Sequence, residues 1–302
     1  MLFRSPYRMF DRIKIPTFLA TRWTSWAVHL AGAFEAYKGI NAPKKLLLME
    51  TESRLGPLRP WADHQDLILR WYDHWLKGND TGFMDEPPIR LLIKGKNEYR
   101  DEQEWPLART QWTKMYLGPN GTLSLSRVES EGSGSFKNDP DLPPNQHAPG
   151  VSFVSAPFDA PTEMTGPVAL YVHARLDQPD ATWIVTVRDV APDGASRTVT
   201  KGWLRASQRE LDVEKSRPYQ PYQKHVRRET LEPGQSYEFA VEIRETSNVF
   251  LPGHRIALDI KGQDTTAEDP IWVHTCNAIP TTHTVQFGGK FDSYLLLPVI
   301  PG

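Results

Sequence analysis

The run "VALYVHARLDQPDATWIVTVRDVAPDG" (Val168–Gly194) contains two apolar segments and the turn that follows the second. Both segments are typical of β-strands, and Ala191-Pro192-Asp193-Gly194 is a typical turn sequence. Similar short segments recur throughout the chain after Pro87, including "IRLLIK", "YEFAVEI", "RIALDIKG" and "SYLLLPVI". Many short strands with Pro and Gly between them predict an all-β region over residues 87–302, a β-sandwich of the jelly-roll type. Within it, the acidic and Ser/Gly/Pro-rich segment Glu129–Pro149 is predicted to be a long loop.

Residues 1–86 show a different pattern, in which strands alternate with helices. "IPTFLAT" (Ile15–Thr21) and "KKLLLME" (Lys44–Glu50) predict buried strands. Between them, apolar residues recur at helical spacing: Leu30, Phe34 and Tyr37. The clearest helix is predicted from Asp63 to Lys77, with Gly78 as its C-cap. This βαβα order predicts a parallel sheet, and its small size indicates the end of a larger α/β domain.

The composition excludes several classes of protein. The chain has 302 residues, 39% hydrophobic and 24% charged, and a formal net charge of −2, which is ordinary for a globular protein. No basic excess suits nucleic acid or an anionic membrane, and no apolar run is long enough to span a bilayer. The N-terminus lacks a secretory signal pattern, so we predict a cytoplasmic protein. The single cysteine, Cys276, allows no internal disulfide and is interpreted as a buried apolar residue.

Several long blocks, in a fixed order, carry a family resemblance. They are "RWYDHWLKGNDTGFMDEPPIRLLIKGKNEYRDEQEWPLART" (Arg70–Thr110), "VSFVSAPFDAPTEMTGPVALYVHA" (Val151–Ala174), "VTVRDVAPDGASRTVTKGWLRASQR" (Val185–Arg209), "LPGHRIALDI" (Leu251–Ile260) and "GGKFDSYLLLPVIPG" (Gly288–Gly302). With these blocks the chain resembles the C-terminal half of the CocE/NonD acyl hydrolases, the group of cocaine esterase-like enzymes and X-Pro dipeptidyl-peptidases. The resemblance implies an α/β-hydrolase domain with a Ser–Asp–His triad, a C-terminal jelly roll, and hydrolysis of esters or X-Pro peptides.

The chain departs from the family pattern at each position of the triad. The nucleophile motif G-x-S-x-G does not occur, and the nearest text, Gly132–Ser135, has no predicted strand before it or helix after it. Where the family places an aspartate just after a tryptophan, this sequence has Trp23-Thr24-Ser25. Where the family histidine follows the next strand, Met49-Glu50-Thr51-Glu52-Ser53 contains no histidine. One branch of the family shows a Trp-Thr pair followed within a few residues by a histidine, and Trp23, Thr24 and His29 resemble it.

Ser25, His29 and Glu50 are therefore the candidate catalytic residues. Ser25 and His29 are four residues apart at the start of a predicted helix, a spacing that puts both side chains on one face. A carboxylate from Glu50, or alternatively Glu52, follows the neighbouring strand and is expected at the same sheet edge. Together they would form a Ser–His–Glu set of nucleophile, base and orienting group. The alternative interpretation is that Thr24 or Ser25 caps the helix and that His29 packs locally.

Three functional hypotheses follow. The first is a serine acyl hydrolase acting on a small acyl ester or a peptide, either a divergent short enzyme or the C-terminal part of a longer one. The second is a non-catalytic β-sandwich module that binds a carbohydrate or a partner chain. The third is a subunit that completes a separate N-terminal hydrolase half, because an unpaired edge of a truncated sheet favours pairing. We predict a homo-oligomer or such a complex, and no cofactor, metal, nucleic acid or membrane as a partner.

Overall fold

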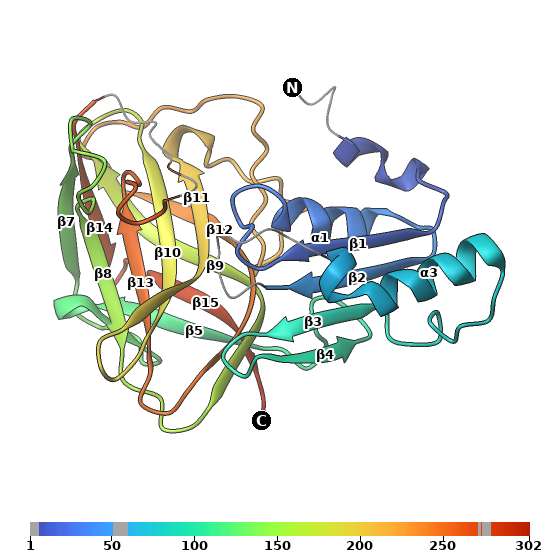
Figure 1. Cartoon of the computed structure of the whole chain (residues 1–302). Helices are drawn as coiled ribbons and strands as arrows, with labels where there is room; N and C mark the ends of the chain where they lie inside the picture. Colours follow the sequence, from blue (N-terminus) through green and yellow to red (C-terminus); the bar gives the residue numbers. More distant parts are fainter. Residues whose placement is uncertain (1–5, 51–59, 271–272, 274–278) are drawn as a thin grey trace. The chain divides into compact units, whose positions relative to one another are not determined.

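The computed structural model describes residues 6–50, 60–270, 273 and 279–302. The chain divides into two compact units, Met1–Ala108 and Arg109–Gly302. Figure 1 shows the elements of both units in sequence colours. The candidate carboxylate Glu52 and the single cysteine, Cys276, lie outside the described residues.

The first unit contains a four-stranded mixed sheet with strand order β1-β2-β3-β4. Its elements are β1 (Thr17–Arg22), α1 (Leu30–Gly39), β2 (Lys44–Met49), α2 (Pro60–Asp63), α3 (Gln65–Lys77), β3 (Ile89–Ile93) and β4 (Glu98–Glu102), after a 3₁₀ helix at Pro6–Arg12. β1 pairs with β2, and β2 with β3, in parallel, as the βαβα order predicted, whereas β3 and β4 are antiparallel. The side chains of β2 from Lys45 to Met49 are all buried, as expected of an inner parallel strand.

Helix α3 forms where its apolar stripe predicted a helix. Leu67, Ile68 and Trp71 are buried on one face of it, and Phe18 of β1 lies 5.6 Å from Trp71, measured between ring centroids. Gly78 ends the helix with φ of 72°, and its N–H donates to the carbonyl of His74. Only glycine adopts this left-handed conformation at little cost, which confirms the predicted C-cap. The helix starts at Gln65 and not at Asp63, since the short α2 precedes it.

The first unit extends past the domain boundary that the sequence suggested. The segment "IRLLIK" was assigned to the sandwich, but Ile89–Ile93 forms β3 and pairs with Leu46, Leu47 and Leu48 of β2. The compact unit therefore ends at Ala108 and not at residue 86. The apolar pattern of this segment identifies a strand but carries no information about its partner, because any hydrophobic sheet can accept it.

The second unit is all-β. Its strands are β5 (Gln111–Gly118), β6 (Thr122–Ser124), β7 (Gly132–Asn138), β8 (Gly150–Ser155), β9 (Thr162–Leu176), β10 (Thr182–Val190), β11 (Ser196–Arg205), β12 (Tyr237–Phe250), β13 (Arg255–Lys261), β14 (Thr281–Phe287) and β15 (Tyr294–Ile300), with 3₁₀ helices at Pro119–Gly121 and Ala206–Gln208. The pairing runs β12-β11-β10-β13-β8-β6-β5-β15-β9, and β9 also pairs with β12, so the strands close into a barrel. β14 and β7 continue from β9 outside this ring.

The barrel is filled by alternate residues of its strands. Ile256, Leu258 and Ile260 of β13 are fully buried in the core. Trp183 of β10 packs there against Phe239 of β12, with ring centroids 4.4 Å apart. Because side chains alternate across a strand, the residues between these positions lie on the outer face. The outer face of β8, β10, β11 and β13 is therefore free to carry polar groups.

One predicted loop contains a strand. Gly132–Asn138, inside the segment expected to be irregular, forms β7 and pairs in antiparallel register with β14. Phe136 supplies the reason, because its ring is buried and stacks on His283 with centroids 4.6 Å apart. The Gly-Ser run before Phe136 gives no strand pattern in the sequence, because glycine and serine have low strand propensity. Ser135 faces Thr284 of β14 and donates a hydrogen bond to its hydroxyl at 3.0 Å. Residues Gly132–Ser135, the nearest match to the nucleophile motif, therefore lie within a strand.

Candidate active site at the ends of β1 and β2

The carboxyl ends of β1 and β2 lie side by side, and the candidate residues follow them directly. Arg22 is in register with Met49, and the backbone N–H of Trp23 donates to the carbonyl of Met49 at 3.2 Å. The turn after β1 therefore starts beside the residue that follows β2, Glu50. The parallel pairing brings these two segments together as the sequence analysis expected.

Glu50 contacts Thr24. One carboxylate oxygen accepts a hydrogen bond from the Thr24 backbone N–H at 3.0 Å, and the other accepts one from the Thr24 hydroxyl at 2.9 Å. These two bonds fix the turn after β1 to the end of β2. A carboxylate held by two donors is oriented, and charge-assisted hydrogen bonds of this kind are stronger than neutral ones.

Ser25 and His29 are placed differently. Ser25 is buried, its hydroxyl accepts a hydrogen bond from Arg22 Nε at 3.3 Å, and its carbonyl accepts the N–H groups of Val28, His29 and Leu30. His29 is the exposed residue before α1, and its side chain forms no capping hydrogen bond. Within the described residues, no hydrogen bond joins the side chains of Ser25 and His29, and Glu50 reaches Thr24 but neither of them. The three candidates thus share one corner without forming a hydrogen-bonded set.

An aromatic cluster packs around Trp23, the first residue of the turn after β1. Trp23 is buried, and its indole N–H donates to the carbonyl of Leu92 at 2.8 Å. Its ring lies 6.2 Å from that of Trp105, which in turn stacks on Phe34 of α1 with centroids 4.7 Å apart. The sequence pattern did not indicate the roles of Trp105 and of the Thr24–Glu50 contact. The signal for the latter is a glutamate directly after the second strand and a threonine two residues after the first.

We expect Glu50→Ala to lower the free energy of unfolding by about 1–2 kcal/mol, because it removes the acceptor of two Thr24 donors. Glu50→Gln keeps an acceptor oxygen at this position and should lose less than half as much. The measurement is equilibrium urea unfolding of the purified chain. Equal losses for the two variants would show that the Thr24 hydrogen bonds contribute little.

The profile described as the X-Pro dipeptidyl-peptidase C-terminal non-catalytic domain matches residues 81–296. The chain belongs to this family. The match extends from the end of the first unit through nearly all of the barrel, and it confirms the resemblance to the CocE/NonD hydrolases drawn from the sequence blocks.

Curated relatives of the family carry hydrolase names. A protein named as a serine esterase from Mycobacterium bovis is 32% identical over 245 residues, which cover 70% of this chain and 38% of that protein. Cocaine esterase from Rhodococcus is 26% identical over 272 residues, covering 76% of this chain and 45% of the esterase. The chain thus spans less than half the length of the curated relatives it matches.

A solved structure shares the fold along almost the whole chain. A CocE/NonD family hydrolase from Staphylococcus aureus superposes with a TM-score of 0.85 at 22% identity, over 97% of this chain and 55% of that protein. Within the described residues, no helix has the length and apolar character needed to cross a membrane. In the same part of the chain, no cluster of three or more His, Cys, Asp or Glu side chains could hold a metal ion.

Proposed function

We propose that this chain is the C-terminal portion of a serine acyl hydrolase for small esters or X-Pro peptides, and that its nucleophile is supplied by a separate N-terminal α/β segment. The observation that carries the proposal is the family match in a chain whose sequence contains no G-x-S-x-G and which spans less than half of its hydrolase relatives. In this proposal the sheet of the first unit is the end of an α/β-hydrolase domain and the barrel is a jelly roll.

The edge strand β1 supports the docking of such a segment. Within the described residues, β1 pairs on one side only, with β2. The N–H groups of Thr17 and Trp23 donate toward the β2 side, so by alternation the N–H of Ala20 points to the open edge. Ala20 is itself exposed. An open parallel edge offers backbone groups to a further strand.

An apolar groove runs beside this edge. Its volume is about 340 Å³, and it is bordered by Phe18 of β1, Leu47 of β2 and Trp71 of α3. Ile15, 72% exposed, and Tyr72, 41% exposed, lie on its rim. Apolar surface of this kind beside an open edge suits a covering α/β segment. The length that the relatives have in addition to the matched part supports an N-terminal hydrolase segment as the occupant.

The test is hydrolysis of p-nitrophenyl butyrate and of Gly-Pro p-nitroanilide, together with fluorophosphonate labelling. The chain is assayed alone and after co-expression with the N-terminal segment of the mycobacterial esterase, in which the family resemblance implies a G-x-S-x-G motif. We expect no turnover by the chain alone, and turnover with labelling of the N-terminal segment in the complex. Ala20→Pro removes the outward N–H but none of the β1–β2 hydrogen bonds, so it should leave the chain folded and abolish complex formation.

Ala20→Ser is the matched control, because it keeps the N–H and should assemble as the native chain does. Turnover and labelling of the chain alone, both lost in Ser25→Ala, would overturn the proposal and establish a serine site at the corner of β1. Self-association that Ala20→Pro abolishes, without binding of the N-terminal segment, would instead indicate a homo-oligomer. Two folded partners that neither bind nor react would also contradict the proposal.

A further inference from the structure

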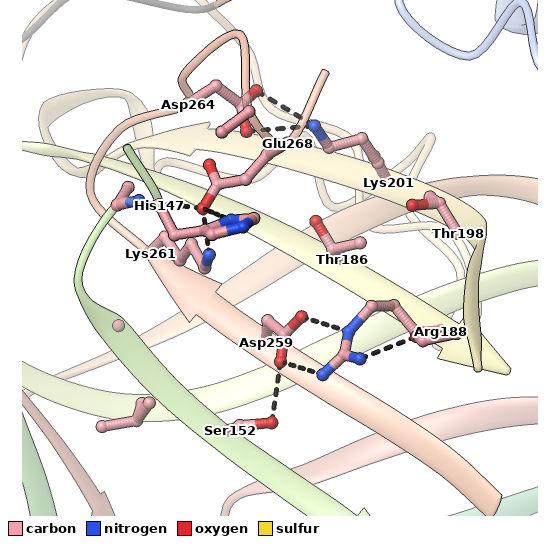
Figure 2. Close-up of a pocket in the computed structure, with 15 residues that line it drawn as sticks. His147, Ser152, Thr186, Arg188, Thr198, Lys201, Asp259, Lys261, Asp264 and Glu268 are labelled. Carbon is pink, nitrogen blue, oxygen red and sulfur yellow. Dashed lines mark hydrogen bonds and ion pairs between the residues drawn. The ribbon is translucent and has the colours of Figure 1, made fainter. Parts of the chain in front are cut away.

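A polar cavity lies on the outer face of the barrel, and the candidate site at β1 does not include it. Its volume is about 520 Å³, within the usual range of small-molecule sites. The floor is formed by outward-facing residues of β8, β10, β11 and β13, and the segments around residues 147–151 and 264–268 form its walls. Figure 2 shows these side chains converging on a common space.

One end of the cavity is organised by Arg188. Its Nε and Nη2 donate to the two oxygens of Asp259 at 2.5 and 2.9 Å, and its Nη1 donates to the Ser196 hydroxyl at 2.8 Å. The Ser152 hydroxyl donates to the same Asp259 carboxylate at 2.7 Å. All three nitrogens of the guanidinium are therefore engaged, and hydrogen bonding to Asp259 raises the pKa of Arg188. This ion pair is a fixed, neutral unit.

The other end repeats this pairing of opposite charges. Lys201 Nζ donates to both oxygens of Asp264 at 3.0 and 3.1 Å. Lys261 pairs with Glu268, whose carboxylate also accepts the Ala148 backbone N–H at 2.9 Å. Each of these three cations in the cavity wall is thus paired with at least one carboxylate, and Lys201 also lies 3.5 Å from the buried Asp269. A charged ligand would have to break one of these pairs, whereas a neutral ligand would not.

Two hydroxyl groups between these ends form no hydrogen bond to any of the described residues. Thr186 of β10 and Thr198 of β11 line the cavity, and among the described residues neither side chain forms a hydrogen bond. Figure 2 shows both between the Arg188–Asp259 pair and the Lys201–Asp264 pair. Apolar atoms of Ala148, Val151 and Ala267 border the same space. The cavity thus combines fixed neutral polar groups, free hydroxyls and a small apolar wall.

We propose that this cavity binds a neutral saccharide unit. The ring hydroxyls of a sugar can use the Thr186 and Thr198 hydroxyls and the remaining lone pairs of Asp259 and Glu268, while the C–H face of the ring packs on the apolar wall. Among the described residues that line the cavity there is no Trp, Tyr or Phe. Recognition therefore rests on hydrogen bonds to rigid groups, which gives orientation and specificity more than affinity.

The test uses the full chain and ligand-observed NMR. The probes are methyl glycosides of glucose, galactose and mannose, with glucosamine, glucuronic acid and the dipeptide Gly-Pro as charged counterparts. We expect at least one neutral glycoside to bind, and the charged probes to bind at least tenfold more weakly. Thr186→Val and Thr198→Val should each weaken binding about fivefold to tenfold, the effect of one hydrogen bond. Thr186→Ser keeps the hydroxyl and should retain native affinity.

Thr113→Val, in β5 outside the cavity, is the matched control and should bind as the native chain does. Circular dichroism of each variant separates a lost hydroxyl from a lost fold. Failure of every neutral glycoside to bind the folded native chain overturns the proposal, as does binding that neither valine variant reduces. Preferential binding of a charged probe or of Gly-Pro would overturn it as well, because the neutral class is what the paired charges imply.

Discussion

Lys201→Met is expected to lower the free energy of unfolding by about 3–5 kcal/mol, the usual loss when one member of a buried ion pair is removed. The side chain of Lys201 is 3% exposed, that of Asp264 is 3% exposed, and that of Asp269, 3.5 Å from the ammonium, is fully buried. Without Lys201, two buried carboxylates lose their common cation. The measurement is equilibrium urea unfolding at pH 7, monitored by far-UV circular dichroism.

The control for Lys201→Met is Lys290→Met, because Lys290 pairs with Glu131 at 3.5 Å but is 70% exposed. Exposed pairs contribute about 0–1 kcal/mol, so this variant should unfold nearly as the native chain does. Burial already raises the pKa of Asp264, and loss of the ammonium should raise it further. A folded-state pKa above the unfolded value favours the folded state as pH falls, so the Lys201→Met deficit should shrink from pH 8 to pH 5. Similar losses for both variants would contradict the expected role of burial.

Acidification is expected to destabilise the barrel by about 3 kcal/mol between pH 7 and pH 4 through His283 alone. Its imidazole is fully buried, stacks on Phe136, and its Nε2 lies 3.0 Å from the Asn138 side-chain oxygen. Burial lowers the pKa of His283 from 6.5 to about 4. In this window the unfolded chain binds a proton that the folded chain does not, so the stability present above pH 6.5 is lost as the pH falls toward 4.

The experiment compares the free energy of unfolding at pH 7 and pH 4.5 for the native chain and His283→Gln. The glutamine variant does not titrate there, so its stability should change with pH by about 2–3 kcal/mol less than that of the native chain. His147→Gln is the matched substitution at a histidine that is 77% exposed, and comparison of the two variants isolates the effect of the buried ring. An identical pH dependence in His283→Gln and the native chain would exclude His283 as the titrating group.

Local patterns predicted the elements of the first unit because its segments match one secondary structure each. The apolar run of β2, the stripe of α3 and Gly78 are local signals that depend on a few neighbouring residues. Strand partners depend on contacts between distant segments, so β3 was assigned to the wrong sheet and β7 was missed. Both errors concern the pairing of strands that are distant in the sequence, which local patterns do not determine.

The same limit applies to the sites. The sequence located the corner of β1 and β2, because parallel strands bring their carboxyl ends to one edge. It did not determine that Glu50 would reach Thr24 and not Ser25, because adjacent residues in a turn point in different directions. The polar cavity on the outer face of the barrel gave no sequence signal at all. Thr186, Thr198 and Asp259 come from three strands, and only the pairing of β10 with β11 and β13 brings them together.

The position of β15 in the ring has a consequence for biosynthesis. Tyr294–Ile300 follows every other strand of the barrel in the chain, yet it lies between β5 and β9 and pairs with both. A ribosome delivers residues in order, so the nascent barrel has two open edges, separated by one missing strand, until this segment has left the exit tunnel. Closure of the ring therefore follows the synthesis of every other barrel strand, and until then the unpaired edges of β5 and β9 can pair with other chains.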